Sequence, residues 1–278
     1  MLYRGNTMSS TLTWRPADGG VRRSGAGRGE LASRQRQDIA HWRAAAGSWI
    51  EWARKPGHDA FWAYRDAFAE FVGAGGGAAL DVGCGEGRVS RLLKSQGYQV
   101  VGADPVVELV SAAKDAQSAR DYAVCAAHAL PFRDGSFDLV IAYNVLMDVE
   151  DIAPALAEMR RVLRPAGTLI VSIVHPIADL GRFATEAPDA PFVITEPYFE
   201  RRQFRASEAR DGLEMPFMGW AQPLQSYMSA LEKAGLAIVS LKEPQPGAGA
   251  ENRHLARWSR LPLFLWFKAR PMAGAADG

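Results

Sequence analysis

The sequence predicts an α/β fold, built on a mostly parallel sheet of seven strands with helices on both faces. Three observations carry this prediction. Short apolar runs typical of buried strands alternate with amphipathic runs from residue 78 to residue 174. A glycine-rich break lies directly between the first of these strands and its helix. One further helix and two apolar runs follow near the C-terminus, which brings the expected strands to seven.

The expected elements are bounded by glycine, proline and changes of period. Amphipathic spacing, clearest at 152–163, predicts helices there and at 106–116 and 223–234. Pro165 and Gly167 separate the middle helix from the next strand, and Gly235 ends the last one. The expected strands cover residues 78–82, 98–103, 121–126, 137–142, 168–174, 236–242 and 261–268.

The N-terminal part of the chain has a different composition. Residues 1–37 are rich in Arg, Gly and Ser with few apolar residues, which predicts a disordered leader. Residues 38–72 predict an extension of two helices, divided at Pro56 and Gly57. These helices either pack their aromatic residues onto the domain or use some of them to line a ligand pocket, and the sequence leaves both open.

The segment 175–222 breaks the pattern inside the main domain, which we expect to cover 73–278. It shows no clear period and carries several aromatic residues. A stretch of this length without regular structure is uncommon unless it serves function, so we expect a lid or substrate cap inserted after the fifth strand. Its aromatic residues form either a small core of the lid or the wall of a substrate pocket.

Composition excludes several classes of protein. The chain has 278 residues, of which 48% are hydrophobic and 23% charged, and its net charge is +1. Neither nucleic acid nor an anionic membrane is therefore an expected partner. Only Cys84 and Cys125 are present, too few for a disulfide framework, and no apolar run approaches the roughly 20 residues of a membrane span. We expect a cytoplasmic protein without a secretory signal.

The glycine-rich break points to a nucleotide-like ligand. The segment LDVGCGEG, residues 80–87, places a flexible turn between strand and helix, where backbone can approach a ligand closely. Asp104 ends the next strand and can accept hydrogen bonds from two ribose hydroxyls. A dinucleotide fits less well, because Arg88 stands where its fingerprint requires Gly or Ala, and because Asp81 would meet a pyrophosphate. A cationic ligand such as S-adenosylmethionine favours a carboxylate at Asp81.

Four motifs in order resemble those of class I S-adenosylmethionine-dependent methyltransferases, which have a Rossmann-like fold. They are LDVGCGEG at 80–87, VGADP at 101–105, LPFRDGSFDLV at 130–140 and RVLRPAGTL at 161–169. The resemblance covers about residues 78–174 and excludes the leader and the lid. It implies S-adenosyl-L-methionine as cofactor and methyl transfer as activity.

The resemblance also implies site residues. Asp81 and the turn would hold the methionine end, Asp104 the ribose, and Pro105 the adenine. An acid that often reaches the adenine amino group in this family is replaced by Ala126, so backbone groups of the next two residues are expected there. The predicted cofactor-binding residues are Asp81, Gly83, Cys84, Gly85, Gly87, Asp104, Pro105, Ala127, His128, Tyr143 and Asn144.

Methyl transfer chiefly requires alignment of the acceptor and exclusion of water, with a general base only for a protonated acceptor. His175 directly follows the fifth strand and is the first candidate base, with Asp148 and His254 as further candidates. The histidines and cysteines lack the spacing of a metal site. The expected reaction moves a methyl group to O, N or C of a small molecule with an apolar or planar body. An NAD-type oxidoreductase and a non-catalytic cofactor-binding module remain alternatives.

Overall fold

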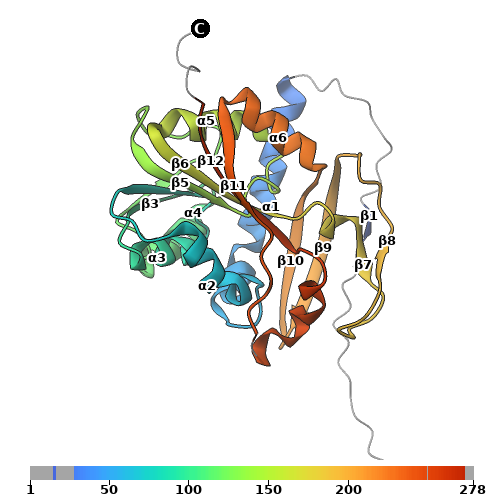
Figure 1. The fold of residues 1–278 in the computed structure, drawn as a ribbon. Coiled ribbons are helices and arrows are strands. Elements are labelled where there is room, and N and C mark those ends of the chain that lie inside the picture. The colour runs from blue at the N-terminus through green and yellow to red at the C-terminus, as the bar shows by residue number, and fades with distance from the viewer. Residues whose placement is uncertain (1–14, 17–27, 249, 273–278) are drawn as a thin grey trace, which may run out of the picture.

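The computed structural model describes residues 15–16, 28–248 and 250–272, without the side chains of 15–16, 28–36 and 250–254 (Figure 1). A central sheet with flanking helices stands beside a smaller antiparallel part, and a long helix runs between the two (Figure 1). Within the described ranges, no helix is both long and apolar enough to cross a membrane.

The predicted seven-stranded sheet is confirmed. The strand β12 (Phe264–Pro271) is antiparallel to both of its neighbours in the sheet. The other four pairs of neighbouring strands are all parallel. The strand order places β2 and β3 side by side, so the glycine-rich turn and Asp104 emerge at the same edge. The order is β11 (Leu236–Lys242), β12 (Phe264–Pro271), β6 (Leu163–Val174), β5 (Phe137–Tyr143), β2 (Ala78–Val82), β3 (Gln99–Asp104) and β4 (Asp121–Val124).

Helices cover both faces of the sheet, as expected for strands buried on two sides. Alternate residues of β5 show this division: Val140 packs with α5 (Ile152–Val162) and α6 (Leu224–Lys233), whereas Ile141 packs with α2 (Phe61–Val72) and α3 (Arg88–Ser95). The helix α4 (Val107–Asp115) packs against β3 and β4. Each fully buried aliphatic side chain of this kind stabilises the fold by about 1.5–3 kcal/mol.

Two expected boundaries shift in the structure. Strand β6 begins at Leu163, five residues early, because the chain becomes extended as soon as α5 ends and Pro165 cannot continue a helix. The register between β5 and β6 is irregular over this early part. The chain between the last two expected strands, 236–242 and 261–268, contains a 3₁₀ helix, η2 (Ala250–Ser259), and the last strand starts at Phe264, three residues later than expected.

The long helix α1 (Arg28–Arg54) starts nine residues before the predicted end of the leader. Residues 28–37, RGELASRQRQ, contain strong helix formers and no proline, so they extend the helix beyond its aromatic part. Residues 1–14 and 17–27 of the predicted leader lie outside the described residues. The helix packs against α4 and against the antiparallel part of the molecule, where Trp52 is buried beside Met215.

The segment 175–222, expected to lack regular structure, consists mainly of two antiparallel pairs, and that expectation is corrected here. After the 3₁₀ turn η1 (Ala178–Leu180), β7 (Gly181–Phe183) pairs with β8 (Phe192–Ile194). Then β9 (Arg202–Arg210) pairs with β10 (Leu213–Ala221), and β1 (Arg15–Pro16) adds to the edge of β9. We call this segment the cap.

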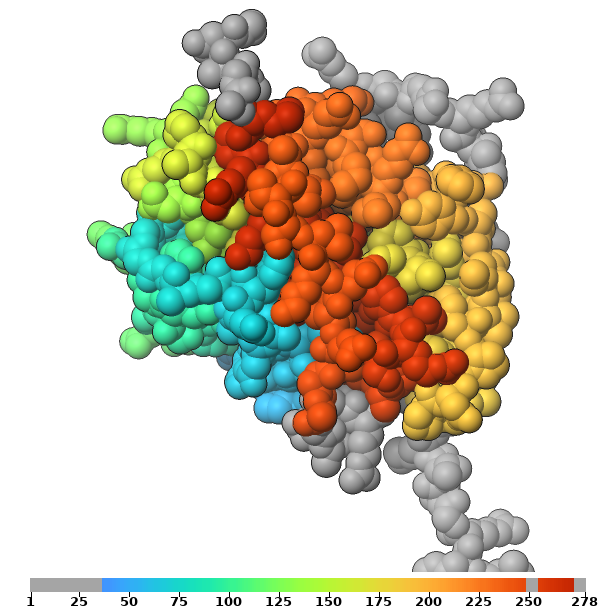
Figure 2. Space-filling view, viewed as in Figure 1, coloured from blue at the N-terminus to red at the C-terminus, as the bar shows by residue number. Residues whose placement is uncertain are grey.

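The β9–β10 hairpin had a signal in the sequence. Asp211 and Gly212 connect the strands with φ of 49° and 80°, the geometry of a two-residue turn that favours Asp-Gly. The strand period is hard to detect because most of β9 is half-buried on both faces. Residues of the cap also meet η2: Trp258 packs edge-on against Phe183, and Figure 2 shows the C-terminal segment in orange and red against the yellow cap.

Candidate functional site

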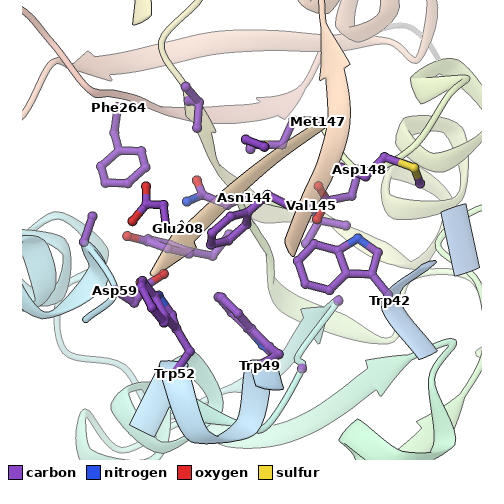
Figure 3. A pocket seen from close by; sticks show the side chains of 18 of the residues that line it. Trp42, Trp49, Trp52, Asp59, Asn144, Val145, Met147, Asp148, Glu208 and Phe264 are labelled. Carbon is purple, nitrogen blue, oxygen red and sulfur yellow. The ribbon is translucent and has the colours of Figure 1, made fainter. Parts of the chain in front are cut away.

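A cavity of about 720 Å³ lies between the carboxyl ends of the parallel strands and the cap (Figure 3). This volume falls within the range of about 300–1,000 Å³ that is typical of small-molecule sites. We divide its lining into two parts. The sheet-edge half comprises lining residues from 83–89, 104–109, 125–128 and 143–149, together with Val174 at the end of β6; the cap half comprises those from 38–60, 178–186, 204–218 and 255–264.

Backbone hydrogen bonds build the turn of the sheet-edge half. The N–H groups of Gly83 and Cys84 both donate to the carbonyl of Ala103, at 2.7 and 3.0 Å. Gly83 has a φ of +69°, and a Cβ there would lie 2.4 Å from Cγ2 of Val145. Glycine is therefore required by backbone conformation and by space, and the turn exposes its peptide groups to the cavity.

Asp104 connects this turn to the next strand. Its Oδ2 accepts a hydrogen bond from the N–H of Gly85 at 3.0 Å, and its Oδ1 accepts one from Val106 at 2.9 Å. Burial raises the pKa of Asp104 to about 6, although these two bonds oppose the shift. Each carboxylate oxygen keeps a second acceptor position, so a ligand with adjacent hydroxyls can still be bound there.

Two predicted ligand-binding residues support the turn from behind. Asp81 is buried, accepts a hydrogen bond from Oγ of Ser90 at 2.6 Å, and is not among the described residues that line the cavity. Burial raises the pKa of Asp81 to about 7. Gly87, also absent from the lining, has a φ of +93°, and a Cβ there would lie 2.2 Å from Oγ of Ser118. Both residues therefore lie behind the described lining, and their direct contact with a ligand stays a prediction.

Glu86 anchors the turn to the helices around it. Its buried carboxylate accepts hydrogen bonds from Arg91 at 2.8 Å on each oxygen, and from Nε of Arg54 at 3.0 Å. Arg54 belongs to α1 and Arg91 to α3, so the pairing ties the N-terminal helix to the sheet domain. Buried carboxylates require such partners, because an unpaired charge would be costly in this environment.

Arg88 forms a second ion pair in the wall of the cavity. Its Nη1 lies 2.6 Å from Oδ1 of Asp59, and its guanidinium lies over the rings of Trp49 and Phe61, 4.7 and 4.8 Å from their centroids. The guanidinium thus fills the position at which a dinucleotide-binding helix would carry Gly or Ala.

Tyr143 is the last residue of β5 and Asn144 follows it, and both line the cavity. Asn144 has a φ of +55°, a conformation rare outside glycine, and its backbone and side chain both bond to Ser172. Because Oδ1 of Asn144 accepts the bond from Ser172 Oγ at 2.7 Å, Nδ2 is the group that can donate to a ligand. The ring of Tyr143 packs edge-on against Phe61 and Phe68.

The three candidate bases are placed very differently. His175 lies outside the cavity lining: its Nδ1 accepts from the N–H of Ile177 at 3.1 Å, and its Nε2 lies 3.1 Å from Oε1 of Glu243. With both ring nitrogens engaged, His175 loses the geometric basis of the predicted role. Burial also lowers its pKa, against the opposing effect of Glu243. His254 lies in η2, and its side chain is outside the described part of the structure.

Asp148 is the candidate that lines the cavity (Figure 3). No hydrogen bond or ion pair joins its carboxylate to another described residue. Burial raises the pKa of Asp148 well above its usual range, and the nearby carboxylates of Asp38 and Asp104 raise it further. Such a carboxylate can accept a proton when a cationic ligand beside it favours ionisation.

Side chains of the cap half supply residues that the sequence did not assign to the site. Trp42, Trp49 and Trp52 project from α1, and Phe217 of β10 meets Trp49 and Trp52 edge-on at 6.3 and 6.4 Å (Figure 3). The seven-residue spacing of Trp42 and Trp49 places both on one helix face, which was a readable signal. Glu208 of β9 is a further missed residue, and its carboxylate points into the cavity (Figure 3).

Of the aromatic residues in the cap, some line the cavity and others do not. Phe183, Phe204 and Phe217 are in the lining, whereas Phe199 is exposed to solvent. The remaining predicted residues of the sheet-edge half, namely Cys84, Gly85, Pro105, Ala127 and His128, all line the cavity. No group of His, Cys, Asp and Glu suitable for a metal ion occurs among the described residues.

Comparison with known sequences identifies relatives of this chain. A family described as "Methyltransferase domain" matches residues 80–171. A demethylmenaquinone methyltransferase of Beutenbergia cavernae is 36% identical over 206 residues, covering 71% of this chain and 80% of the relative. A malonyl-[acyl-carrier protein] O-methyltransferase of Enterobacter lignolyticus is 28% identical over 186 residues, 65% of this chain and 68% of the relative. Alignments to two further proteins of that name span 37% and 44% of their lengths.

Solved structures share the fold. An S-adenosylmethionine-dependent methyltransferase from Mesorhizobium loti superposes with a TM-score of 0.60 at 24% identity, covering 76% of this chain and 98% of that one. A Burkholderia thailandensis 1,6-didemethyltoxoflavin N1-methyltransferase, solved with 1,6-didemethyltoxoflavin and S-adenosylhomocysteine, superposes with a TM-score of 0.56 at 18% identity, covering 96% and 99%.

Proposed function

Because the chain belongs to the class I S-adenosylmethionine-dependent methyltransferases, we propose that it moves a methyl group from this cofactor to O, N or C of a small molecule with an apolar or planar body. The observation that carries the proposal is one cavity with two unlike walls. A glycine turn and a buried carboxylate form one wall, and aromatic side chains form the other.

The sheet-edge half suits the cofactor. Asp104 would accept hydrogen bonds from the ribose hydroxyls while it keeps those that it accepts from the N–H groups of Gly85 and Val106. Pro105 would pack on the adenine, and backbone groups of Ala127 and His128 would meet its polar edge. Trp49 would cover the methionine end, since its Nε1 lies only 3.2 Å from the position of a Cβ at Gly85.

The residues behind the turn act indirectly in this proposal. Asp81 would hold α3 in position through Ser90 rather than touch the cofactor. Asn144 would donate from Nδ2 to the methionine carboxylate or to the acceptor. Of the remaining predicted residues, Cys84 would contact the cofactor through its backbone, and Tyr143 through the edge of its ring.

When bound, S-adenosylmethionine supplies a methyl group on a cationic sulfur. The residues of the chain then have three tasks: they orient the acceptor, exclude water and accept a proton where the acceptor carries one. The aromatic wall of Trp49, Trp52 and Phe217 would orient an apolar body and keep water out. Asp148 would take the proton, because a cationic cofactor lowers the pKa of a nearby buried carboxyl.

The names of the relatives do not select an acceptor, because they include both malonyl-[acyl-carrier protein] and demethylmenaquinone. The lining of the cap half favours a small molecule that inserts between aromatic rings. We also propose a cytoplasmic location, in keeping with the free thiols of Cys84 and Cys125.

A calorimetric titration with S-adenosylmethionine, S-adenosylhomocysteine and NADH tests the proposal. We expect micromolar binding of the first two and no binding of NADH. A screen of small aromatic acceptors with methyl-labelled S-adenosylmethionine then tests transfer. Binding of NADH alone would favour an oxidoreductase. Binding of S-adenosylmethionine without transfer to any acceptor would favour a binding module that has lost catalysis.

A further inference from the structure

Three of the four arginines among the described lining residues already have an acceptor. Arg88 pairs with Asp59 at 2.6 Å, and Arg257 pairs with Glu186 at 2.8 Å. Arg210 donates to the carbonyl oxygen of His58 at 2.8 Å. The remaining lining arginine, Arg182, has no ion-pair partner among the described residues, but it is exposed to solvent, where water and salt screen its charge. At the other three arginines, an anionic ligand would have to compete with an existing acceptor.

Two carboxylates of the lining, in contrast, have oxygen atoms that lack a hydrogen-bond donor among the described residues. No described residue donates a hydrogen bond to Glu208, and its carboxylate forms only a long ion pair with Nη2 of Arg210, at 4.0 Å. Burial raises the pKa of Glu208, and the carboxylates of Asp59 and Glu186 add to this rise, whereas the guanidinium groups of Arg210 and Arg257 oppose it. Asp38 is only 6% exposed, lines the cavity, and its Oδ2 has no hydrogen-bond partner within the described ranges. The lining thus offers acceptors that need donors.

Glu208 is the carboxylate best placed to meet an acceptor. It lies on β9, which also contributes Phe204 and Ala206 to the lining, so inward residues alternate along the strand. Figure 3 shows its carboxylate directed toward the space bordered by Trp52, Asp59 and Asn144. This position belongs to the cap half, opposite the glycine turn and Asp104.

We infer that Glu208 selects acceptors that carry a basic nitrogen on an apolar, planar body, and that the cap half rejects carboxylates. The inference rests on the proposed function, whose acceptor class it narrows. An ammonium or amine would donate a charge-assisted hydrogen bond to Glu208 while its body packs against the cavity side of the aromatic pair Trp52 and Phe217. A carboxylate in the same place would face the like charge of Glu208 and lose its hydration, while the nearby guanidinium groups of Arg210 and Arg257 already have acceptors.

Three indole probes with a common ring system test the inference on the full chain saturated with S-adenosylhomocysteine. They are tryptamine, which is cationic, 3-methylindole, which is neutral, and indole-3-acetate, which is anionic. We expect calorimetry to show tryptamine binding at least about 10-fold more tightly than indole-3-acetate. The substitution Glu208→Gln should weaken tryptamine binding about 5-fold or more and change 3-methylindole binding less than about 2-fold.

Glu214→Gln is the matched control, because Glu214 lies on the adjacent strand β10, bonds to Ser207 and is absent from the described cavity lining. It should leave all three affinities unchanged. Equal or tighter binding of indole-3-acetate, unaltered tryptamine binding in Glu208→Gln, or no tryptamine binding at millimolar concentration would overturn the inference. Failure of S-adenosylhomocysteine to bind would instead contradict the proposed function, so the two failures can be told apart.

Discussion

The two halves of the cavity are built in different ways. In the sheet-edge half, much of the cavity wall consists of peptide groups of consecutive residues, and Gly83, Gly85 and Asp104 fix the geometry of these groups. In the cap half, side chains converge from α1, the cap strands and η2, which are far apart in the sequence. A site made of backbone at strand ends can be recognised from a short motif, whereas a site made of dispersed side chains cannot.

This difference in construction leads us to expect that the two halves have different roles, one in binding the cofactor and the other in selecting the acceptor. The sheet-edge half rests on the most buried part of the molecule, where β2, β3 and β5 pair in parallel. The cap half rests on a small separate cluster around Trp52 and Met215. We therefore expect substitutions in one half to change cofactor binding and those in the other to change acceptor binding, and the following predictions test that separation.

The largest expected effect concerns Asp148, which lies in the sheet-edge half but is proposed to act on the acceptor. Replacing it with Asn removes the proton acceptor, so turnover with a protonated acceptor should fall about 100- to 10,000-fold. Steady-state rates with an acceptor found by the labelled-methyl screen measure this. Because the pKa of Asp148 is raised, acidification should protonate it, and so abolish wild-type activity, at a higher pH than is usual for a carboxyl group. The pH–rate profile of the variant should lack this acidic fall in activity.

The control for this prediction is Asp189→Asn, an exposed position that is not among the described lining residues. It should keep wild-type turnover. If Asp148→Asn stayed within a few-fold of wild type at every pH, the chemistry would need no base, and Asp148 would belong with the binding residues.

The second prediction concerns stability and pH. The pKa of Asp104 is about 6 in the folded protein and near 3.8 when unfolded, so the folded state binds the proton more tightly. Its contribution to the free energy of unfolding is therefore highest below pH 4 and falls by up to about 3 kcal/mol as pH rises to about 6. Asp104→Asn should lack this fall. Urea denaturation of both proteins between pH 4 and 7.5, without cofactor, measures the difference, and parallel curves would refute the assignment.

The third prediction tests the sheet-edge half directly. Asp104→Ala removes charge-assisted bonds to the ribose, which should weaken S-adenosylhomocysteine binding by about 1–3 kcal/mol, or roughly 5- to 150-fold. Calorimetry measures it, with the exposed Asp115→Ala as a control expected to match wild type. Unchanged affinity in Asp104→Ala would remove Asp104 from the cofactor site.

The smallest effect is expected in the cap half. Phe217→Leu keeps an apolar side chain but removes the edge-on contacts with Trp49 and Trp52, so 3-methylindole binding should weaken about 2- to 10-fold. Cofactor affinity should be unchanged. A matching loss of S-adenosylhomocysteine affinity would show that the two halves are coupled through Trp49, and the division drawn between them would fail.

The sequence predicted the sheet well because its signals are local. Each parallel strand is a short apolar run bounded by a turn, and the strand β12 and the helices α5 and α6 lie within a few residues of their expected places. The turn at 80–87 and Asp104 were found for the same reason, since strand ends that are adjacent in a parallel sheet meet at one edge. The hydrogen bond from Ser90 to Asp81 could not be predicted from the sequence, because it depends on which side of the strand faces the helix α3.

The base illustrates the limit more sharply. His175 follows a strand whose end does reach the correct edge, yet Ile177 and Glu243 hold its ring outside the cavity. Asp148 has a weaker local signal and is in the lining. Only the packing of loops against one another determined which of the two lines the cavity.

By itself, then, the sequence determined the sheet, its glycine turn and the family, because strand period and turn chemistry act over fewer than ten residues at a time. The tertiary structure determined the cap half: the hairpin β9–β10, the tryptophans of α1 and Glu208 come together only when segments more than 100 residues apart are folded against each other. Side-chain contacts between such distant segments leave no periodic trace in the chain, because each depends on the surface that the other presents.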